Sequence, residues 1–337
     1  MGNYSKALEF HEKSLKISEK TLPPNHLDLA TSYNSIGQVY NYMGDYSKAL
    51  EFYEKDLEIT KKALPSTHPD LAASYNNIGL VYNNMGDYLE ALEFYKKDLE
   101  IMKKALPSTH PDLATSYNSI GQVYNNMGDY SKALEFHENS LKMREKVLPS
   151  NHPNLATSYD NIGQVYNNMG DYSKALEFHE KSLKIREKVL PPNHPDLGTS
   201  YNNTGQVYNN MGDYSKALEF YEKDLEIAKK ALHPTHPDLA ISYNNIGQVH
   251  NHMSDYSKAL EFYEKAHKIF EKALPSNHPN LAISKHDIGC VYEDMGEYSK
   301  ANQFYERAVE VAQLSLPANH EHLQLVRIRS LDDDMFD

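Results

Sequence analysis

The chain has 337 residues, with 47 acidic against 34 basic side chains and a formal net charge of −13. This acidic excess argues against a nucleic-acid partner and against binding to anionic membrane surfaces. The sequence shows no apolar run of membrane-spanning length and no signal-peptide pattern, and its single cysteine, Cys290, excludes an internal disulfide framework and fits a reducing compartment. We therefore expect a cytoplasmic protein.

The sequence repeats itself every 42 residues. The segment from Tyr75 to Tyr88 returns almost letter for letter around positions 117, 159, 201 and 243, with looser copies around 33 and 285. A fixed period in this range indicates stacked supersecondary units rather than one globular core. We therefore expect one continuous array over residues 1–331.

The first predicted element is a lone helix over residues 2–22, which matches the second half of the repeat. Met1 aligns with Met43, which ends the first half of the next copy. We therefore expect that the chain starts inside a repeat and that in-frame coding sequence continues upstream. Complete repeats follow the lone helix and start near residues 27, 69, 111, 153, 195, 237 and 279.

The repeat at residues 67–108 shows why each complete unit should form two helices. Pro69 suits the first position of a helix, and apolar residues then recur at spacings of three and four. Gly86 ends this helix, and Asp87 is a suitable N-cap for a second helix, which Pro107 closes. The resulting helical hairpin has two apolar faces, so it needs neighbouring hairpins to bury them.

The last predicted element is a degenerate first helix over residues 321–331. It carries Arg327 and Arg329 where earlier copies have Tyr or polar residues, and we interpret it as a C-terminal cap. Residues 332–337 form a short acidic tail. The expected fold is an all-α, right-handed superhelical solenoid of helical hairpins.

The repeat resembles the tetratricopeptide repeat at the positions Tyr75, Ile78, Gly79, Tyr82, Ala91 and Tyr95. It differs in having Tyr for the usual Trp and a longer second helix, which stretches the period to 42 residues. This longer form resembles the repeats of kinesin light chains and, more distantly, those of spindle-orientation adaptors. The resemblance implies that the first helices line a concave groove for a partner protein. The coiled-coil segment through which kinesin light chains pair with the heavy chain has no counterpart in this sequence.

The face of each first helix opposite to its tyrosines carries amide side chains. In the family that the repeat resembles, this face lines the groove, and each carboxamide could offer a donor and an acceptor to the main chain of an extended peptide. The candidate peptide-binding residues are Asn34, Gln38, Asn41, Asn76, Asn83, Asn118, Gln122, Asn125, Gln164, Asn167, Asn202, Gln206, Asn209, Asn244, Gln248 and Asn251. The other interpretation is a solvated polar face that duplication has multiplied.

Charged and reactive groups are scarce on this face. The first helices between residues 27 and 253 contain no Lys or Arg, so a carboxylate clamp that grips C-termini has no cations. Cys290 has no partner cysteine, and no histidine is tied to it by a motif. We therefore expect no catalytic residue and no cofactor.

Histidines recur at one loop position of the repeat, but stacked helices about 8–10 Å apart cannot bring them to a single metal ion. We expect these residues to pack at helix starts and to hold no metal. They are His26, His68, His110, His152, His194, His236, His278 and His320. Three further histidines, His11, His137 and His179, stand at the position of Tyr53 and are expected to be half-buried in the core.

The expected function is a non-catalytic protein–protein interaction scaffold that binds an extended peptide segment of a partner. Two other functions stay open. One is a cargo adaptor of the kinesin light chain type, with kinesin heavy chain as a candidate partner. The other is the C-terminal recognition region of a larger enzyme whose catalytic domain lies upstream of Met1. A purely structural spacer is a further interpretation.

Overall fold

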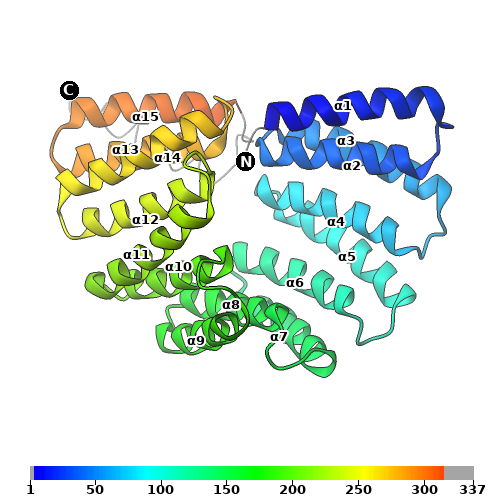
Figure 1. Cartoon of the computed structure of the whole chain (residues 1–337), viewed down its shortest axis with the longest axis horizontal. Helices are drawn as coiled ribbons and strands as arrows, with labels where there is room; N and C mark the ends of the chain where they lie inside the picture. Colours follow the sequence, from blue (N-terminus) through cyan, green and yellow to red (C-terminus); the bar gives the residue numbers. More distant parts are fainter. Residues whose placement is uncertain (1–3, 315–337) are drawn as a thin grey trace. The chain divides into compact units, whose positions relative to one another are not determined.

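The computed structural model describes residues 4–314, and this part of the chain folds into fifteen α-helices without any strand (Figure 1). The helices form two compact units, which meet in sequence between Val189 and Leu190. The first unit contains α1 (Tyr4–Thr21), α2 (Leu27–Tyr42), α3 (Tyr46–Ala63), α4 (Pro69–Asn84), α5 (Tyr88–Ala105), α6 (Pro111–Asn126), α7 (Tyr130–Val147), α8 (Pro153–Asn168) and α9 (Tyr172–Val189). The second contains α10 (Pro195–Asn210), α11 (Tyr214–Ala231), α12 (Pro237–His252), α13 (Tyr256–Ala273), α14 (Pro279–Asp294) and α15 (Tyr298–Gln313).

We call the even-numbered helices the first helices of the hairpins, and the odd-numbered helices that follow them the second helices. The predicted all-α array of helical hairpins is confirmed. As predicted, α4 begins at Pro69, and α5 ends at Ala105, two residues before Pro107. The predicted C-terminal cap at residues 321–331 and the acidic tail at residues 332–337 lie outside the described residues.

A histidine caps the start of each first helix. In α4 the Nδ1 atom of His68 accepts a hydrogen bond of 3.1 Å from the backbone N–H of Asp70. Pro69 takes the first helical position, where a missing N–H costs nothing. The same cap forms at His26, His110, His152, His194, His236 and His278. These seven histidines therefore act as N-caps, as the predicted packing at helix starts requires. The eighth, His320, lies outside the described residues.

A sharp turn joins the two helices of each hairpin. After α4 ends, Gly86 has a φ of +78°, in the left-handed region that costs other residues roughly 1–2 kcal/mol. At the equivalent position after α12, Ser254 takes a φ of +60°. An aspartate then starts most second helices. Asp129, for example, accepts a hydrogen bond of 3.2 Å from the backbone N–H of Lys132.

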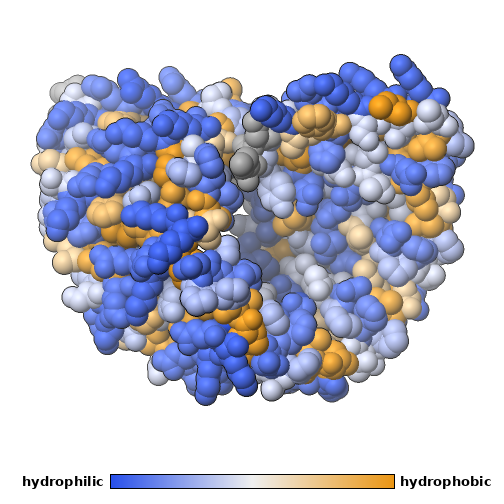
Figure 2. Space-filling view, viewed as in Figure 1, coloured by the Kyte–Doolittle hydropathy of each residue, from blue (hydrophilic) through white to orange (hydrophobic). Residues whose placement is uncertain are grey.

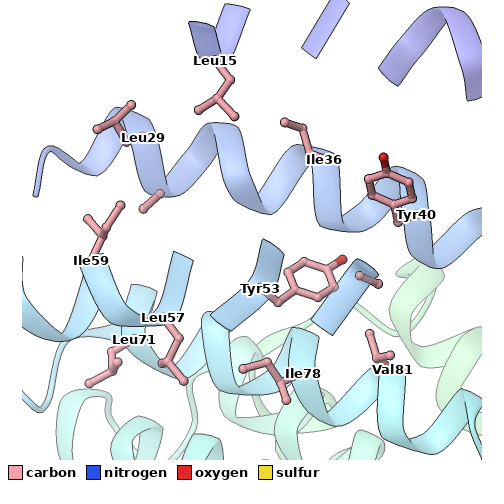
Figure 3. Close-up of a cluster of buried hydrophobic side chains, with 12 residues drawn as sticks. Leu15, Leu29, Ile36, Tyr40, Tyr53, Leu57, Ile59, Leu71, Ile78 and Val81 are labelled. Carbon is pink, nitrogen blue, oxygen red and sulfur yellow. The ribbon is translucent and has the colours of Figure 1, made fainter. Parts of the chain in front are cut away.

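Each helix packs mainly against the helices next to it in the chain. In the first unit, the ring of Tyr53 on α3 lies in a buried cluster with Ile36 of α2 and Ile78 of α4 (Figure 3). Burying one large apolar side chain stabilises a fold by roughly 1.5–3 kcal/mol, and the cluster recurs in later hairpins. The repeated tyrosines therefore serve the core.

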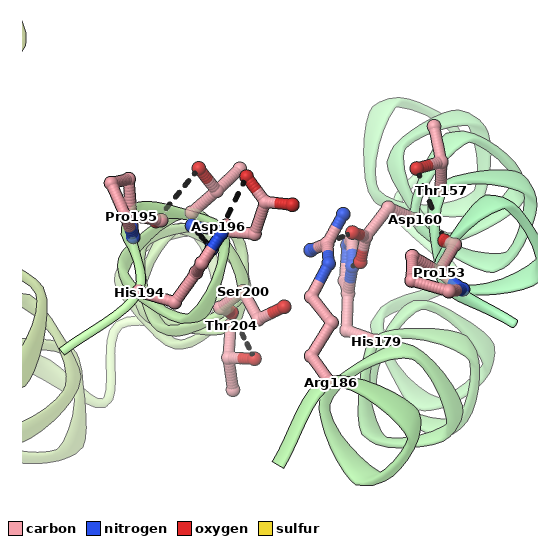
Figure 4. A network of polar contacts seen from close by, with 11 residues as sticks. Pro153, Thr157, Asp160, His179, Arg186, His194, Pro195, Asp196, Ser200 and Thr204 are labelled. Carbon is pink, nitrogen blue, oxygen red and sulfur yellow. Dashed lines mark hydrogen bonds and ion pairs between the residues drawn. The ribbon is translucent and has the colours of Figure 1, made fainter. Parts of the chain in front are cut away.

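The α8–α9 hairpin also holds a buried charged cluster (Figure 4). Asp160 and Arg186 are each 6% exposed, and their Oδ2 and Nη1 atoms lie 2.5 Å apart. The Nδ1 atom of His179 lies 3.1 Å from Oδ1 of Asp160. His179 is fully buried, so the prediction of a half-buried side chain is wrong for this residue because a partner for its ring lies inside the hairpin.

The α6–α7 hairpin has a related cluster, in which Asn118 takes the place of Asp160 and Arg144 takes that of Arg186. His137 is also fully buried, against prediction, and its Nδ1 atom lies 2.9 Å from Oδ1 of Asn118. Burial lowers the pKa of His137 to about 4, so its ring is neutral at physiological pH. His11, at the same position of the repeat, is partly exposed as predicted.

The outer surface of the hairpins is polar. Hydrophilic residues predominate on the face drawn in Figure 2, with apolar residues scattered among them. Lys and Glu pair along the second helices, as in Glu51 and Lys55, whose charged atoms lie 2.6 Å apart. Among the described helices, none combines the length and apolar character that crossing a bilayer requires.

Candidate functional site

The amide side chains of the first helices join each helix to the next one. In the first unit, Nδ2 of Asn84 donates to Oδ1 of Asn41 over 3.1 Å. Asn126 donates in the same way to Asn83, and Asn168 to Asn125, each over 3.0 Å. Every pair is 43 residues apart, so the bonds form a ladder that crosses from one repeat to the next.

The second unit continues this pattern with other partners. Nδ1 of His252 lies 3.0 Å from Oδ1 of Asn209, and Asn251 donates to Asp294 over 2.9 Å. We call this set of contacts the lower ladder. Asn41, Asn125 and Asn209 are buried, because the ladder holds them between helices. Asn167 is also buried and has polar contacts of its own.

A second ladder lies two turns earlier on the same helices. Asn161 donates to Asn118 over 2.6 Å, and Asn245 donates to Asn202 over 2.5 Å. Asn244 donates to Asp287 over 3.0 Å. We call these contacts the upper ladder. Like the lower ladder, it links side chains 43 residues apart.

Asn76 links the upper ladder to a second helix. Its Nδ2 atom lies 3.2 Å from Oδ2 of Asp98 on α5 and 3.4 Å from Oγ of Ser119 on α6. Asn34, at the same position of the preceding repeat, lies beside Asp56 of α3. Hydrogen bonds to other helices thus engage most of the predicted asparagines, and these bonds fix the spacing of the first helices.

The predicted glutamines are placed differently. Gln122 and Gln164 donate only to Asn126 and Asn168 of their own helices, over 2.9 Å and 3.0 Å. Gln38 and Gln248 are exposed, and Gln206 is partly exposed. Oε1 of Gln248 also accepts a hydrogen bond of 3.4 Å from Nδ2 of Asn209 on α10. We call Gln38, Gln122, Gln164, Gln206 and Gln248 the glutamine line. Among the candidate residues, the two exposed side chains, Gln38 and Gln248, belong to this line.

Two clefts open beside these ladders, one in each unit. The cleft between α2, α3 and α4 has a volume of about 300 Å³ and is lined by Asn34, Asp56 and Thr60, among others. The cleft between α10, α11 and α12 has the same volume and is lined by the equivalent residues Asn202, Asp224 and Ala228. The sequence pattern singled out the two asparagines but not the clefts.

Buried carboxylates on the second helices were also missed by sequence analysis. Asp56, Asp98 and Asp224 are at most 9% exposed. Burial raises the pKa of Asp98 and of Asp224 to about 6, despite hydrogen bonds to each carboxylate that lower it. The signal in the sequence is that these aspartates, 42 and 126 residues apart, recur at one inward position of the repeat. The carboxylates of Asp98 and Asp224 accept hydrogen bonds from side chains of the first helices, Asn76 and Ser242.

Other groups with potential reactivity in the described residues lie away from the two clefts. Within residues 4–314, no three His, Cys, Asp or Glu side chains are grouped in a way that could hold a metal ion. Cys290 is partly buried, and its Sγ lies 3.6 Å from Nδ1 of His286, one turn earlier in α14. This contact links two neighbours on one helix and does not adjoin either cleft.

Comparison with known families agrees with this architecture. The model of the tetratricopeptide repeat matches residues 1–62, 70–146, 117–188, 154–230, 196–272 and 238–313. No curated protein sequence matches the chain. The predicted resemblance to tetratricopeptide repeats is thereby confirmed.

Solved structures with the same arrangement of hairpins include proteins of the kinesin light chain type. BtubC (BKLC) from P. vanneervenii is 22% identical with a TM-score of 0.56, over 69% of this chain and 94% of that one. A putative kinesin light chain from Podosopora anserina with nearly identical TPR-like repeats is 28% identical with a TM-score of 0.50, over 61% of this chain and 98% of that one. A Rap protein complexed with Competence and Sporulation Factor is 13% identical with a TM-score of 0.62, over 99% of this chain and 94% of that one.

Proposed function

Because this chain belongs to the tetratricopeptide-repeat family, we propose that it is a non-catalytic scaffold that binds an extended segment of a partner protein along its first helices. Repeat arrays of stacked hairpins present an extended surface to a partner. On this chain the surface is built from amides at a constant period. The proposal places the binding segment on the glutamine line.

The observation that carries the proposal is a difference between the asparagines and the glutamines of the first helices. The asparagine ladders fix neighbouring first helices at a constant spacing. Within each unit the glutamine line follows that spacing, except at α4 and α14, where Leu80 and Cys290 take the position. The bonds of Gln122 and Gln164 stay within their own helices. A carboxamide can give one hydrogen bond and accept another, as the main chain of an extended peptide requires. A row of such groups suits recognition of peptide backbone.

The first test replaces three members of the glutamine line in the first unit. A binding peptide is selected by display from a random library, and its affinity is measured by titration calorimetry. The variant carries Gln38→Ala, Gln122→Ala and Gln164→Ala. Each hydrogen bond contributes about 0.5–1.5 kcal/mol net, so the peptide should bind at least tenfold more weakly.

A matched variant controls for general effects of three surface substitutions. Glu51→Ala, Glu135→Ala and Glu177→Ala have the same spacing but lie on exposed positions of the second helices. The surface ion pairs of Glu51 and Glu177 contribute little to stability. This variant should bind as the unaltered protein does. Equal losses in both variants, or no loss in the glutamine variant, would remove the glutamine line from the binding site.

A cargo adaptor of the kinesin light chain type is the second candidate function. The similarity to the putative kinesin light chain from Podosopora anserina favours it. Pull-down with purified kinesin heavy chain tests this candidate. Retention of the heavy chain would support it, and its absence from the bound fraction at micromolar concentrations would leave the general scaffold function only.

A further inference from the structure

The two clefts occupy the same place in the repeat. Thr60 and Asp56 in the α2–α4 cleft correspond to Ala228 and Asp224 in the α10–α12 cleft, four repeats later. Each cleft is bounded by a first helix, its second helix and the next first helix. In both clefts, a buried carboxylate is followed one helical turn later by a small side chain. Both side chains line the opening of the cleft.

The carboxylates in the clefts lack a positive partner. Asp56 is 4% exposed, and its Oδ2 atom is buried without a hydrogen-bond partner. Asp224 is 9% exposed and accepts a hydrogen bond of 2.6 Å from Ser242. Among the ion pairs of residues 4–314, none includes either aspartate. A buried carboxylate without a cation is costly, and a cation that entered the cleft would relieve that cost.

Another repeat of the same chain shows which side chain fits the cleft. In the α6–α7 hairpin the position of Thr60 is taken by Arg144. Its Nη1 atom donates to the backbone oxygen of Asn154 over 3.1 Å and to Oγ of Ser158 over 2.8 Å. These two residues correspond to Asp70 and Ser74, which line the α2–α4 cleft. The guanidinium of Arg144 therefore fills the volume that is open in the α2–α4 cleft.

The charge pattern changes together with this side chain. Where the second helix carries Arg144 or Arg186, the residue one turn earlier is Ser140 or Ser182. Where it carries Thr60 or Ala228, that residue is an aspartate. An aspartate at the position of Asp56 therefore occurs only in hairpins without an arginine at the position of Thr60. In the α8–α9 hairpin, Arg186 pairs instead with Asp160 of the first helix.

We propose that the α2–α4 and α10–α12 clefts are specificity pockets, each of which takes one arginine side chain from the bound partner segment. This inference rests on the proposed scaffold function. Thr60 and Ala228 leave room for the guanidinium, and Asp56 and Asp224 supply its counter-charge. Arginine is favoured over lysine because its planar fork can bond a carboxylate and a neighbouring oxygen at once. The partner segment should thus be basic, in keeping with the acidic scaffold.

The test uses a defined probe, the capped peptide acetyl-Gly-Ser-Arg-Ser-Gly-amide, and the same peptide with citrulline in place of arginine. Citrulline keeps the shape of the side chain and removes its charge. Saturation-transfer NMR with the full chain reports binding of each peptide. The arginine peptide should show saturation of its side-chain protons and bind at least tenfold more tightly than the citrulline peptide, because hydrogen bonds to charged groups are the stronger ones. Equal binding of the two peptides would overturn the proposal.

Two double variants locate the binding. Thr60→Arg with Ala228→Arg fills both clefts as Arg144 does, and should abolish the difference between the peptides. Asp56→Asn with Asp224→Asn removes the counter-charge with little change of shape, and should have the same effect even if the arginine variant folds poorly. An arginine preference that persists in the folded asparagine variant would overturn the proposal.

A control pair and the selection experiment complete the test. Glu51→Gln with Glu219→Gln removes two exposed carboxylates at the same spacing of four repeats and should leave the arginine preference unchanged.

The display selection separates this proposal from the scaffold function. If the arginine peptide is preferred but the selection yields no binding peptide, the pockets are supported and the scaffold function is rejected. Selected peptides that bind without a basic residue, together with equal probe binding, would reject the pockets and leave the scaffold function standing.

Discussion

Replacing Gly163 by tryptophan is expected to lower the free energy of unfolding of the first unit by at least about 3 kcal/mol, at the upper end of the usual cost of overpacking. A Cβ atom at position 163 would lie 2.9 Å from Cε1 and Nε2 of His179. The ring of His179 is fully buried and cannot swing aside. The larger indole must therefore push α8 and α9 apart.

The same substitution should make unfolding less cooperative. Because each helix packs mainly against its neighbours in the chain, α8 and α9 can separate while α1 to α7 stay folded. Differential scanning calorimetry should then show more than one transition. Thr157→Trp, at an exposed position of α8, is the control and should cost less than about 1 kcal/mol. A single two-state transition of unchanged stability in the Gly163 variant would contradict this expectation.

Replacing Asp160 by alanine is expected to cost about 3–5 kcal/mol, the range found when one partner of a buried ion pair is removed. Asp160 contacts both Arg186 and His179 inside the α8–α9 hairpin. Without its carboxylate, the buried guanidinium loses a charged partner, and the imidazole loses its hydrogen bond. Urea denaturation followed by circular dichroism measures the loss.

Two further variants separate charge from shape at this position. Asp160→Asn should cost less than Asp160→Ala, because Asn118 takes the equivalent place beside His137 in the α6–α7 hairpin. Adding Arg186→Met to Asp160→Ala should recover part of the loss, and the double-mutant cycle gives the coupling energy of the pair. A cost below about 1 kcal/mol for Asp160→Ala would mean that the cluster does not stabilise the hairpin.

The helices could be predicted from the sequence because their signals are local. Pro69 and Gly86 each fix a backbone conformation that depends on few neighbours, and the apolar spacing between them has the period of a helix. Forty-two residues later the same signals return, so the positions of the hairpins along the chain follow from the spacing alone.

The partners of the amides could not be predicted, because they depend on how one repeat is offset against the next. The period of 42 residues would pair Asn41 with Asn83, but the stacking brings Asn84 to Asn41 instead. Asn83 in turn contacts Asn126 of the following repeat. Because this offset cannot be read from the sequence, the asparagines were predicted to be as available to a peptide as the glutamines.

The buried aspartates were missed for a related reason. Asp56 stands close to the charged residues Glu54, Lys55 and Glu58 in the sequence, and such a carboxylate is ordinarily assigned to the solvent side. Only the packing of α4 against α3 places it inside. A comparison of repeats gives the clue, because Ser140 and Ser182, which replace this aspartate in two repeats, are each followed by an arginine one turn later.

Photo-cross-linking would show directly whether the first helices bind the partner segment. A display-selected peptide that carries a benzophenone group is irradiated with the full chain, and the attachment sites are mapped by mass spectrometry. We predict attachment to first helices, close to the glutamine line. Attachment confined to exposed positions of the second helices, such as Glu51, Glu135 and Glu177, would contradict binding at this face.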